Sequence, residues 1–441
     1  MTPNRLILVT SLALFAMFFG AGNLIIPVMI GVDAGHLSWI AAIGFICSGV
    51  LLPAMSMVAL ASKRKEEKRL ADRLGAPIGL VLTTAIFLSC GMIYGIPRVG
   101  AVSFEFAVAP LVNDSQWALA IYLFVFFAVA YTLARRPAKM VRHIGMVLTP
   151  TLLVLLAALV IASFTVPVIN TEASPQFSSS PVAGGFIQGY FTMDALAALV
   201  FGGVIVASFA AAGHADRQLQ KSTALAGVTA GLLLSVVYLG LIRVGLVGSG
   251  SNGAEVISGV AHQIFGRSGQ MLFGAIVVLA CLTTTLGLIA AFVHYFHELV
   301  PNVSAHAWLV ICVSVSFALA NLGLERILAV VAPLNQLLYP MVICLIVVSL
   351  VDLVVPIRLL WSYRAPAWIA GVLAVVEALY TTGISLFMPV REWLNLLPMG
   401  QLHMAWVVPA LVGLFVGVGM DYANRNGHSN RANPGDKFVT A

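Results

Sequence analysis

The chain has 441 residues, of which 60% are hydrophobic and only 9% are charged. Soluble domains carry about 25% charged residues, so this composition excludes a soluble domain and indicates a protein that lies in the membrane. A net charge of +6 would suit a nucleic-acid partner, but the basic residues gather in short segments between apolar stretches, where they orient membrane helices. We therefore expect contacts with membrane lipid and none with nucleic acid.

Apolar stretches of about 20 residues, each enough to cross the hydrocarbon core, recur along the whole chain. The fold class that they predict is an all-α polytopic membrane protein with twelve transmembrane helices. The first apolar stretch is too long for the apolar region of a signal peptide, so we expect it to remain as a helix. The predicted spans are 6–32, 36–62, 76–110, 116–134, 141–166, 186–213, 222–248, 269–300, 306–321, 327–354, 366–389 and 402–422.

The distribution of charge favours an even number of spans. With both chain ends inside the cell, most of the 23 Lys and Arg residues fall in cytoplasmic segments, as is usual for the loops of membrane proteins. An arrangement with eleven spans would place part of this basic set outside. We therefore predict that both termini are cytoplasmic and that 423–441 is a cytoplasmic tail.

The first predicted span contains Gly20, Ala21, Gly22 and Asn23 at mid-depth. Glycine costs about 1 kcal/mol relative to alanine inside a helix, and free backbone polar groups in hydrocarbon cost several kcal/mol each. A break is tolerated there only where the backbone is buried in protein or lines a cavity. Broken helices at the bilayer midplane form the substrate and ion sites of many secondary transporters, so this stretch predicts a transporter.

The sixth predicted span contains Phe191, Thr192, Met193 and Asp194. A carboxylate at the centre of a membrane helix costs roughly 2.5–3.5 kcal/mol, so Asp194 is expected to face a polar interior. The first and sixth spans have the spacing of two five-helix repeats whose first helices are both interrupted. An odd-numbered repeat must be inverted, so the breaks are expected to meet near the midplane. Helix N-termini would then face a substrate carboxylate, and free carbonyls would face a cation.

The eighth predicted span carries three consecutive threonines, Thr283, Thr284 and Thr285. Their hydroxyls cover most of the helix circumference, so at least one must face the other helices. Each hydroxyl could simply bond to the preceding helical turn. Oxygen ligands also suit a hard cation, and the two interrupted helices make an ion site an equally good interpretation.

Charged residues and cysteines inside other spans are less specific. Arg98 and Glu105 lie two turns apart on one helix face. We interpret them first as structural ion-pairing groups and second as transport residues. Glu377 could likewise carry a proton or pair with a neighbour. The 5 cysteines are isolated and show no C-x-x-C spacing, so no metal or redox site is expected.

Short motifs occur in a specific order along most of the chain. They are F-F-G-A-G-N-L-I-I-P at 18–27, P-R-V-G-A-V-S-F-E at 97–105, G-Y-F-T-M-D-A-L at 189–196, N-G-A at 252–254, A-N-L-G-L at 320–324 and Y-P at 339–340. Through these motifs the sequence resembles the branched-chain amino acid:cation symporter family, which comprises bacterial carriers of leucine, isoleucine and valine. The resemblance implies uptake of these amino acids driven by sodium or, in some relatives, by protons.

The resemblance also implies the leucine-transporter-like fold of the amino acid–polyamine–organocation superfamily. Helices one to five would form a first repeat over 1–166, and helices six to ten a second, inverted repeat over 186–354. The segment 366–422 would hold two extra helices. The expected location is the bacterial inner membrane.

In that fold, the carboxylate and amine of the substrate lie on the breaks of helices one and six. The resemblance implies a substrate site at Gly20, Ala21, Gly22, Asn23, Phe191, Thr192, Met193 and Asp194. It implies a cation site between helices one and eight, formed by carbonyls of Ala16, Phe19 and Ala280 and hydroxyls of Thr283 and Thr284. Asn23 and Thr192 are similar to ligands of a second sodium site. The expected coupling ion is Na⁺ or H⁺, with no other cofactor.

The sequence departs from these family patterns in three places. The seventh predicted span has no asparagine for the second sodium site between Ala224 and Val247. Val28 stands where close relatives have a second proline, which would alter the shape of the first break. Asp194 replaces a small hydroxyl residue of sodium-coupled neurotransmitter-type relatives, which would change how the substrate amine or the ion is held.

The leading hypothesis is thus a cation-coupled importer of branched-chain amino acids. The alternative within transporters is a proton-coupled carrier of another small apolar or aromatic amino acid. A channel would use broken helices in an oligomeric filter, and the sequence shows no filter repeat. A membrane enzyme would need clustered His, Asp or nucleophile motifs such as H-E-x-x-H, and the sequence contains none. We therefore expect a transporter and not an enzyme.

Overall fold

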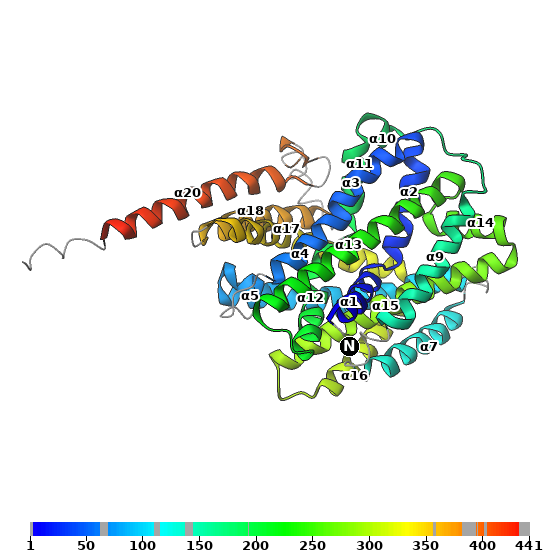
Figure 1. The fold of residues 1–441 in the computed structure, drawn as a ribbon, viewed down its shortest axis with the longest axis horizontal. Helices are drawn as coiled ribbons and strands as arrows, with labels where there is room; N and C mark the ends of the chain where they lie inside the picture. Colours follow the sequence, from blue (N-terminus) through cyan, green and yellow to red (C-terminus); the bar gives the residue numbers. More distant parts are fainter. Residues whose placement is uncertain are drawn as a thin grey trace, which may run out of the picture. The chain divides into compact units, whose positions relative to one another are not determined.

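The computed structural model describes residues 3–61, 69–109, 115–136, 144–192, 194–355, 359–381, 394, 396–400 and 404–431. The described residues form helices and connecting turns without a strand, which confirms the all-α class (Figure 1). By its internal contacts the chain splits into two compact units, which we describe separately. The first unit contains Met1–Ala61 and Ile86–Val331, and the second contains Ser62–Ala85 and Ala332–Ala441.

Helices α5 and α17 belong partly to each unit, and the other helices belong to one. The first unit holds α1 (Pro3–Phe18), α2 (Ala21–Ala34), α3 (Ser38–Ile46), α4 (Leu52–Ala61), α6 (Gly95–Ala107), α7 (Gln116–Ala134), α9 (Thr149–Ser163), α10 (Pro175–Ser179), α11 (Pro181–Phe191), α12 (Asp194–Ala211), α13 (Asp216–Val247), α14 (Gly253–Phe265), α15 (Arg267–Leu299) and α16 (Ala305–Ala320). The remaining helices are α5 (Ala76–Leu88), α17 (Leu324–Val354), α18 (Trp361–Thr381) and α20 (Val407–Arg431).

The length and hydropathy of the helices confirm a multi-pass membrane protein. Among the described residues, nine helices are long and apolar enough to cross a membrane, and two shorter apolar helices, Asn4–Phe18 and Ala305–Ala320, accompany them. The first predicted span is divided between α1 and α2. The predicted span 366–389 falls on α18 as far as Thr381, and the rest of it lies outside the described residues. The count of twelve spans therefore stays a prediction.

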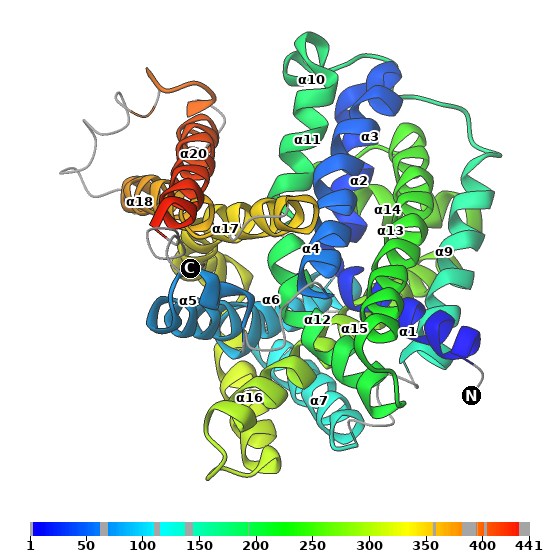
Figure 2. The same ribbon diagram turned by 60° about the vertical axis from the view of Figure 1, so that its left-hand side comes forward.

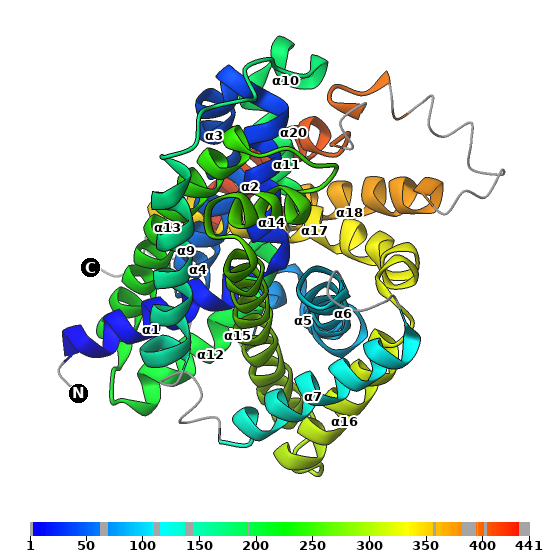
Figure 3. The same cartoon turned by 90° about the vertical axis from the view of Figure 1, so that its right-hand side faces the viewer.

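Two long helices, α13 and α15, form the centre of the first unit. Helix α13 contacts α1, α2 and α4, while α15 contacts α1, α6, α12 and α14. Figure 3 shows α15 beside α6 and α14. Every residue from Ala280 to Ile289 in α15 is buried, as expected of a helix that is apolar on all sides. The threonine triplet therefore lies inside the protein and not against lipid.

Helices α3 and α11 approach each other closely through small residues (Figure 2). A Cβ atom on Gly44 would lie 1.9 Å from the carbonyl oxygen of Val182, and one on Gly185 would lie 1.8 Å from the carbonyl oxygen of Ala41. Both distances are far below van der Waals contact, so any side chain would push the helices apart. Small residues serve this purpose in many membrane helix pairs. The contact fixes the helix that leads into the second predicted break.

The third predicted span is kinked in its interior. A π-helical turn at Ser89–Ile93 separates α5 from α6, and Gly91 within it has a non-helical backbone, with φ −87° and ψ −125°. Turns of this kind often occur at functional sites. Pro97 lies in the first turn of α6, where its missing N–H removes no helical hydrogen bond. Helix α6 thus begins within the span, and its first turn carries Arg98.

The second unit is tied together by two polar clusters. In one, the Asp421 carboxylate of α20 accepts hydrogen bonds from the backbone N–H groups of Leu360, Trp361 and Ser362 at 2.9, 3.0 and 2.9 Å. These N–H groups stand at the start of α18, where no helical acceptor exists for them. Asp421 therefore caps α18 from the neighbouring helix, and α18 and α20 pack side by side (Figures 1 and 2).

In the other cluster, the buried Arg73 joins the 3₁₀ turn Leu70–Leu74 to α17 and α18. Its Nη1 atom lies 3.6 Å from Oδ2 of Asp352 and donates to the Ser349 hydroxyl at 3.1 Å. The same atom donates to the Tyr363 hydroxyl. Because a buried charge is tolerated only when it is paired and hydrogen-bonded, this cluster defines how the three elements pack.

Candidate functional site

The first predicted break is present at Phe19 and Gly20. Helix α1 ends at Phe18 and α2 begins at Ala21, and Gly20 between them is extended, with φ −93° and ψ −175°. The break therefore lies slightly before the Gly20–Gly22 stretch that the sequence indicated, because Gly22 already belongs to α2. The first N–H groups of α2 have no helical acceptor, so this helix start can bind an anion.

The second predicted break follows α11. That helix ends at Phe191, and α12 begins at Asp194. Thr192 lies in a turn between them but has helical backbone angles, φ −65° and ψ −25°, so the non-helical backbone predicted here stays a prediction for the described residues. Met193, the remaining predicted site residue of this segment, lies outside the described residues. The Thr192 hydroxyl donates to the carbonyl oxygen of Gly189 at 2.7 Å, and so gives a hydrogen bond to a carbonyl in the last turn of α11. Asp194 stands in the first turn of α12, where a negative charge complements the helix dipole.

The two breaks meet through Asn23. Its Nδ2 atom donates to Oδ2 of Asp194 at 2.5 Å and to the hydroxyl oxygen of Tyr238 at 2.7 Å. All three side chains are buried. With Nδ2 facing both Asp194 and Tyr238, the two amide hydrogens of Asn23 are both used. One hydrogen-bonded group thus connects α2, α12 and α13, in agreement with the prediction that the breaks face each other.

Tyr238 is a site residue that the sequence analysis missed. It comes from the seventh predicted span, where an asparagine was sought for the second sodium site. Its ring packs against Phe45, with 5.1 Å between ring centroids, and lies 6.3 Å from the ring of Phe19. A tyrosine inside an apolar span was the available signal, because its hydroxyl needs a partner when buried. The identity of that partner is a tertiary contact that no local pattern encodes.

Arg98 lies next to the first break. A Cβ atom on Gly22 would be 3.8 Å from Nη2 of Arg98, and the guanidinium interacts electrostatically with Asp194. Its Nη1 atom also donates to the Tyr94 hydroxyl at 3.1 Å. Glu105 is exposed, whereas Arg98 is half-buried. The structure therefore directs Arg98 toward the first break, a position that fits both interpretations, structural pairing with a neighbouring helix and a role in transport.

The predicted cation ligands of helices one and eight lie together. The Thr283 hydroxyl is 2.9 Å from the carbonyl oxygens of both Ala16 and Ala280, and the Thr284 hydroxyl is 3.4 Å from that of Ala16. All of these residues are buried. Hydrogen bonds thus connect four of the five predicted ligands, which lie in α1 and α15. The fifth, Phe19, belongs to the adjacent break and is buried.

Gly20 in the first break and Gly22 in the first turn of α2 face different groups. A Cβ atom on Gly20 would lie 3.3 Å from the Thr284 hydroxyl oxygen, on the side of α15. The corresponding position on Gly22 points to Arg98, on the side of α6. The break therefore stands between a cluster of neutral oxygens and a pair of opposite charges. Such an arrangement can hold a small cation on one side and a zwitterion on the other.

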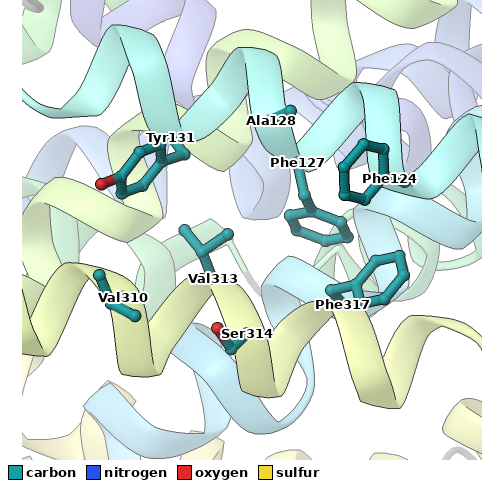
Figure 4. A pocket seen from close by; sticks show the side chains of 8 residues that line it. All are labelled: Phe124, Phe127, Ala128, Tyr131, Val310, Val313, Ser314 and Phe317. Carbon is teal, nitrogen blue, oxygen red and sulfur yellow. The ribbon is translucent and has the colours of Figure 1, made fainter.

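An apolar groove lies elsewhere in the first unit, between α7 and α16 (Figure 4). Its volume is about 340 Å³, and among the described residues that line it only Ser314 and Tyr131 have polar side chains. Phe124 at its edge is 65% exposed, as suits a surface in contact with lipid. This lining offers no charge for an ammonium or a carboxylate, so the groove does not compete with the breaks as a substrate site.

These features, buried breaks in two membrane helices that meet through polar side chains, define a membrane transport protein with broken helices. Comparison with known families is more specific. Residues 3–424 match the model of the branched-chain amino acid transport protein family. Since the match covers nearly the whole chain, the protein belongs to this family, and the family resemblance of the sequence motifs is confirmed.

Individual relatives are similar over almost their full length. The branched-chain amino acid permease BrnQ of Corynebacterium glutamicum is 38% identical over 429 residues, which cover 97% of each chain. The permease BraB of Bacillus subtilis is 34% identical over 430 residues, covering 94% of this chain and 95% of the relative. The BrnQ permease of Escherichia coli K12 is 33% identical over 432 residues, covering 95% and 96%.

A solved structure supports the fold. The nucleobase-cation-symport-1 family transporter Mhp1, in a closed conformation with bromovinylhydantoin bound, matches with a TM-score of 0.54. The alignment covers 95% of this chain and 93% of Mhp1 at 15% sequence identity. At this identity the likeness shows the fold alone, which is that of a helical membrane transporter.

Proposed function

We propose that the protein imports leucine, isoleucine and valine in symport with a cation, by alternating access. The observation that carries this proposal is the hydrogen bond from Asn23 to Asp194, which joins the two helix breaks at a buried position. Membership in the branched-chain amino acid transport protein family supports the substrate class. In this proposal the substrate lies on Gly20, Ala21, Gly22 and Asn23 from one break and on Phe191, Thr192, Met193 and Asp194 from the other.

The zwitterion fits the charges at the breaks. The start of α2 offers free N–H groups to the carboxylate, and Asp194 offers an acceptor to the ammonium. Asn23 already occupies Oδ2 of Asp194, so the ammonium would use Oδ1. The aliphatic side chain would lie against apolar residues of the surrounding helices, since branched-chain substrates differ only in their hydrocarbon part.

The coupling ion of the proposal is sodium. Its ligands would be the carbonyls of Ala16, Phe19 and Ala280 and the hydroxyls of Thr283 and Thr284, which are oxygen donors of the kind that hard cations prefer. In the described structure these hydroxyls bond to the Ala16 and Ala280 carbonyls. A cation would replace those bonds with ion–oxygen contacts. The alternative is a proton-coupled carrier of another small apolar or aromatic amino acid, with Asp194 as the protonatable group.

The proposed layout places twelve helices in the bacterial inner membrane with both termini in the cytoplasm. Helices one to five and six to ten would form two inverted repeats, and the last two helices would follow them. This layout is supported by the positive charge of the predicted cytoplasmic segments, and by the likeness to Mhp1.

Reconstitution into proteoliposomes tests the function. Uptake of radiolabelled leucine is measured with an inward sodium gradient at equal pH, and separately with an inward proton gradient in sodium-free buffer. Counterflow against unlabelled leucine is the control that separates a carrier from a channel. Uptake that follows the sodium gradient, with counterflow, supports the proposal. Uptake that follows only the proton gradient favours the alternative, and the absence of both uptake and counterflow excludes leucine as the substrate.

A further inference from the structure

Arg98 is held in a fixed direction at the start of α6. Its Nη1 atom donates to the Tyr94 hydroxyl at 3.1 Å, and its guanidinium carbon lies 5.4 Å from the centroid of the Tyr94 ring. Tyr94 itself is buried against Ala101 and Ile327. The kink before α6 places both residues within the membrane span. One edge of the guanidinium is thereby anchored.

The rest of the guanidinium faces the first break. A Cβ atom on Gly22 would be 3.8 Å from Nη2, so the glycine leaves the guanidinium open toward the backbone at the start of α2. Asp194, at the start of α12, accepts a hydrogen bond from Asn23 and so brings a carboxylate to the same pair of breaks. The two helix breaks are therefore flanked by one fixed positive and one negative side chain.

The presence of two charged side chains, Arg98 and Asp194, within membrane spans requires an explanation. Arginine does not lose its proton in proteins, and a charged side chain within a membrane span is costly unless it is paired or functional. Tyr94 uses one of the five guanidinium donors, and the planar fork remains suited to a bidentate carboxylate. An α-amino acid presents both a carboxylate and an ammonium, which is the complement of the Arg98 and Asp194 pair.

We propose that Arg98 binds the α-carboxylate of the transported amino acid and that it sets the requirement for a carboxylate. In the absence of substrate, Arg98 and Asp194 compensate each other across the break. When the substrate enters, its carboxylate pairs with Arg98 and its ammonium with Asp194, so neither charge is left alone. This inference rests on the proposed function and adds to it the recognition of the carboxylate. Leucine is accepted, and leucinamide, which keeps the side chain and ammonium but lacks the negative charge, is rejected.

The test measures the binding of leucine and leucinamide to the purified full-length protein by calorimetry. The wild type is expected to prefer leucine by about tenfold or more, because a charge-assisted bidentate contact is lost in leucinamide. Arg98→Gln should weaken leucine binding by about tenfold or more while leaving leucinamide binding within a factor of about three. The preference then disappears. Arg98→Lys should keep part of it, since lysine retains the charge but not the planar fork.

Two further variants keep the test decisive. Gly22→Ala places a methyl group in ordinary contact with the guanidinium, so it should reduce leucine binding more than leucinamide binding even if Arg98→Gln does not fold. Arg243→Gln is the matched control. Arg243 is also buried in a membrane helix, but its Nη2 atom donates to the carbonyls of Ser163 and Val166 at 3.2 and 2.9 Å. This variant should leave the ratio of the two affinities unchanged.

The outcomes separate the two proposals. If the wild type binds leucine, and Arg98→Gln or Gly22→Ala weakens leucine and leucinamide equally, Arg98 is a structural residue and the inference is wrong while the proposed function stands. If the wild type binds no leucine, the proposed function is wrong and the carboxylate role is lost with it. A preference that collapses in Arg98→Gln and persists in Arg243→Gln supports the inference.

Discussion

Asn23 and Asp194 are 171 residues apart in the chain, and a hydrogen bond of 2.5 Å joins them inside the first unit. Each belongs to the first turn of the helix that follows a break. The bond therefore fixes the relative position of the two interrupted spans. Any ligand that enters between them must either fit beside this hydrogen bond or replace it. This relationship is the geometric basis of the proposed substrate site.

Asp194→Asn tests the charge at this position. Asparagine keeps the volume and much of the hydrogen bonding, but it leaves Arg98 without its negative counterpart and offers the substrate ammonium no charge. A hydrogen bond to a charged group contributes about 1.5–3 kcal/mol, so loss of the contact with the substrate ammonium should lower leucine uptake by about tenfold or more at equal expression. Uptake in proteoliposomes is the measurement. Near-normal uptake would mean that backbone groups alone hold the substrate.

The pH dependence of the same assay separates two roles of Asp194. If the carboxylate pairs with the substrate ammonium, uptake driven by sodium should not change when a proton gradient is imposed. If Asp194 is instead the proton carrier, uptake should require that gradient, and Asp194→Asn should abolish the response to it.

Thr284→Val tests the cation site. Valine keeps the volume of threonine and removes the hydroxyl, which lies 3.4 Å from the Ala16 carbonyl. A polar contact to a charged group contributes about 1.5–3 kcal/mol, so the sodium concentration for half-maximal uptake should rise about tenfold or more. Thr285→Val is the matched control, because the buried Thr285 hydroxyl has no hydrogen-bond partner among the described residues. Equal sodium dependence in both variants would place the site elsewhere.

Tyr238→Phe tests the support of Asn23. The substitution leaves one amide hydrogen of Asn23 without an acceptor, which costs about 1–3 kcal/mol for a buried donor. We expect the KM for leucine to rise by about fivefold to tenfold, because Asn23 is no longer held on both sides. Tyr122→Phe removes a comparable hydrogen bond, the 2.5 Å contact with Ser103, and serves as control. A similar KM in both variants would contradict a positioning role for Tyr238.

Asp421→Ala tests the second unit independently of transport chemistry. It removes the acceptor for three N–H groups at the start of α18, and the loss of an N-terminal cap costs about 0.5–2 kcal/mol. Thermal unfolding in detergent should shift to lower temperature, while the KM for leucine should stay within about a factor of two of the wild type. Asn424→Ala, at an exposed position of the same helix, should show no such shift.

The helix breaks could be predicted from the sequence because their cause is local. Gly20 permits an extended backbone at a depth where a continuous helix would otherwise form, and Asp194 is too polar to face lipid. The proximity of Thr283 to Ala16 was anticipated only through the family resemblance, since nothing in either helix indicates the other.

The contacts of Tyr238 and Arg98 could not be predicted from the sequence. Tyr238 reaches Asn23 across 215 residues, and its apolar neighbours in α13 give no hint of this contact. Arg98 was interpreted first as a structural ion-pairing group, paired with Glu105 on the same helix face or with a neighbouring helix. The π-helical turn at Ser89–Ile93 and the kink at Gly91 set where α6 begins, and they place Arg98 beside Gly22 instead. A π-helical turn leaves no reliable mark in an apolar sequence.

The central claim is that a substrate and a cation bind side by side on the same helix break. Their binding must then be thermodynamically coupled, and the coupling must be reciprocal. The most direct measurement is the Kd of leucine for the purified protein in sodium chloride and in choline chloride of equal ionic strength. We expect sodium to lower this Kd by at least about fivefold, and leucine to lower the Kd of sodium by the same factor. An identical leucine Kd in both salts would contradict the account.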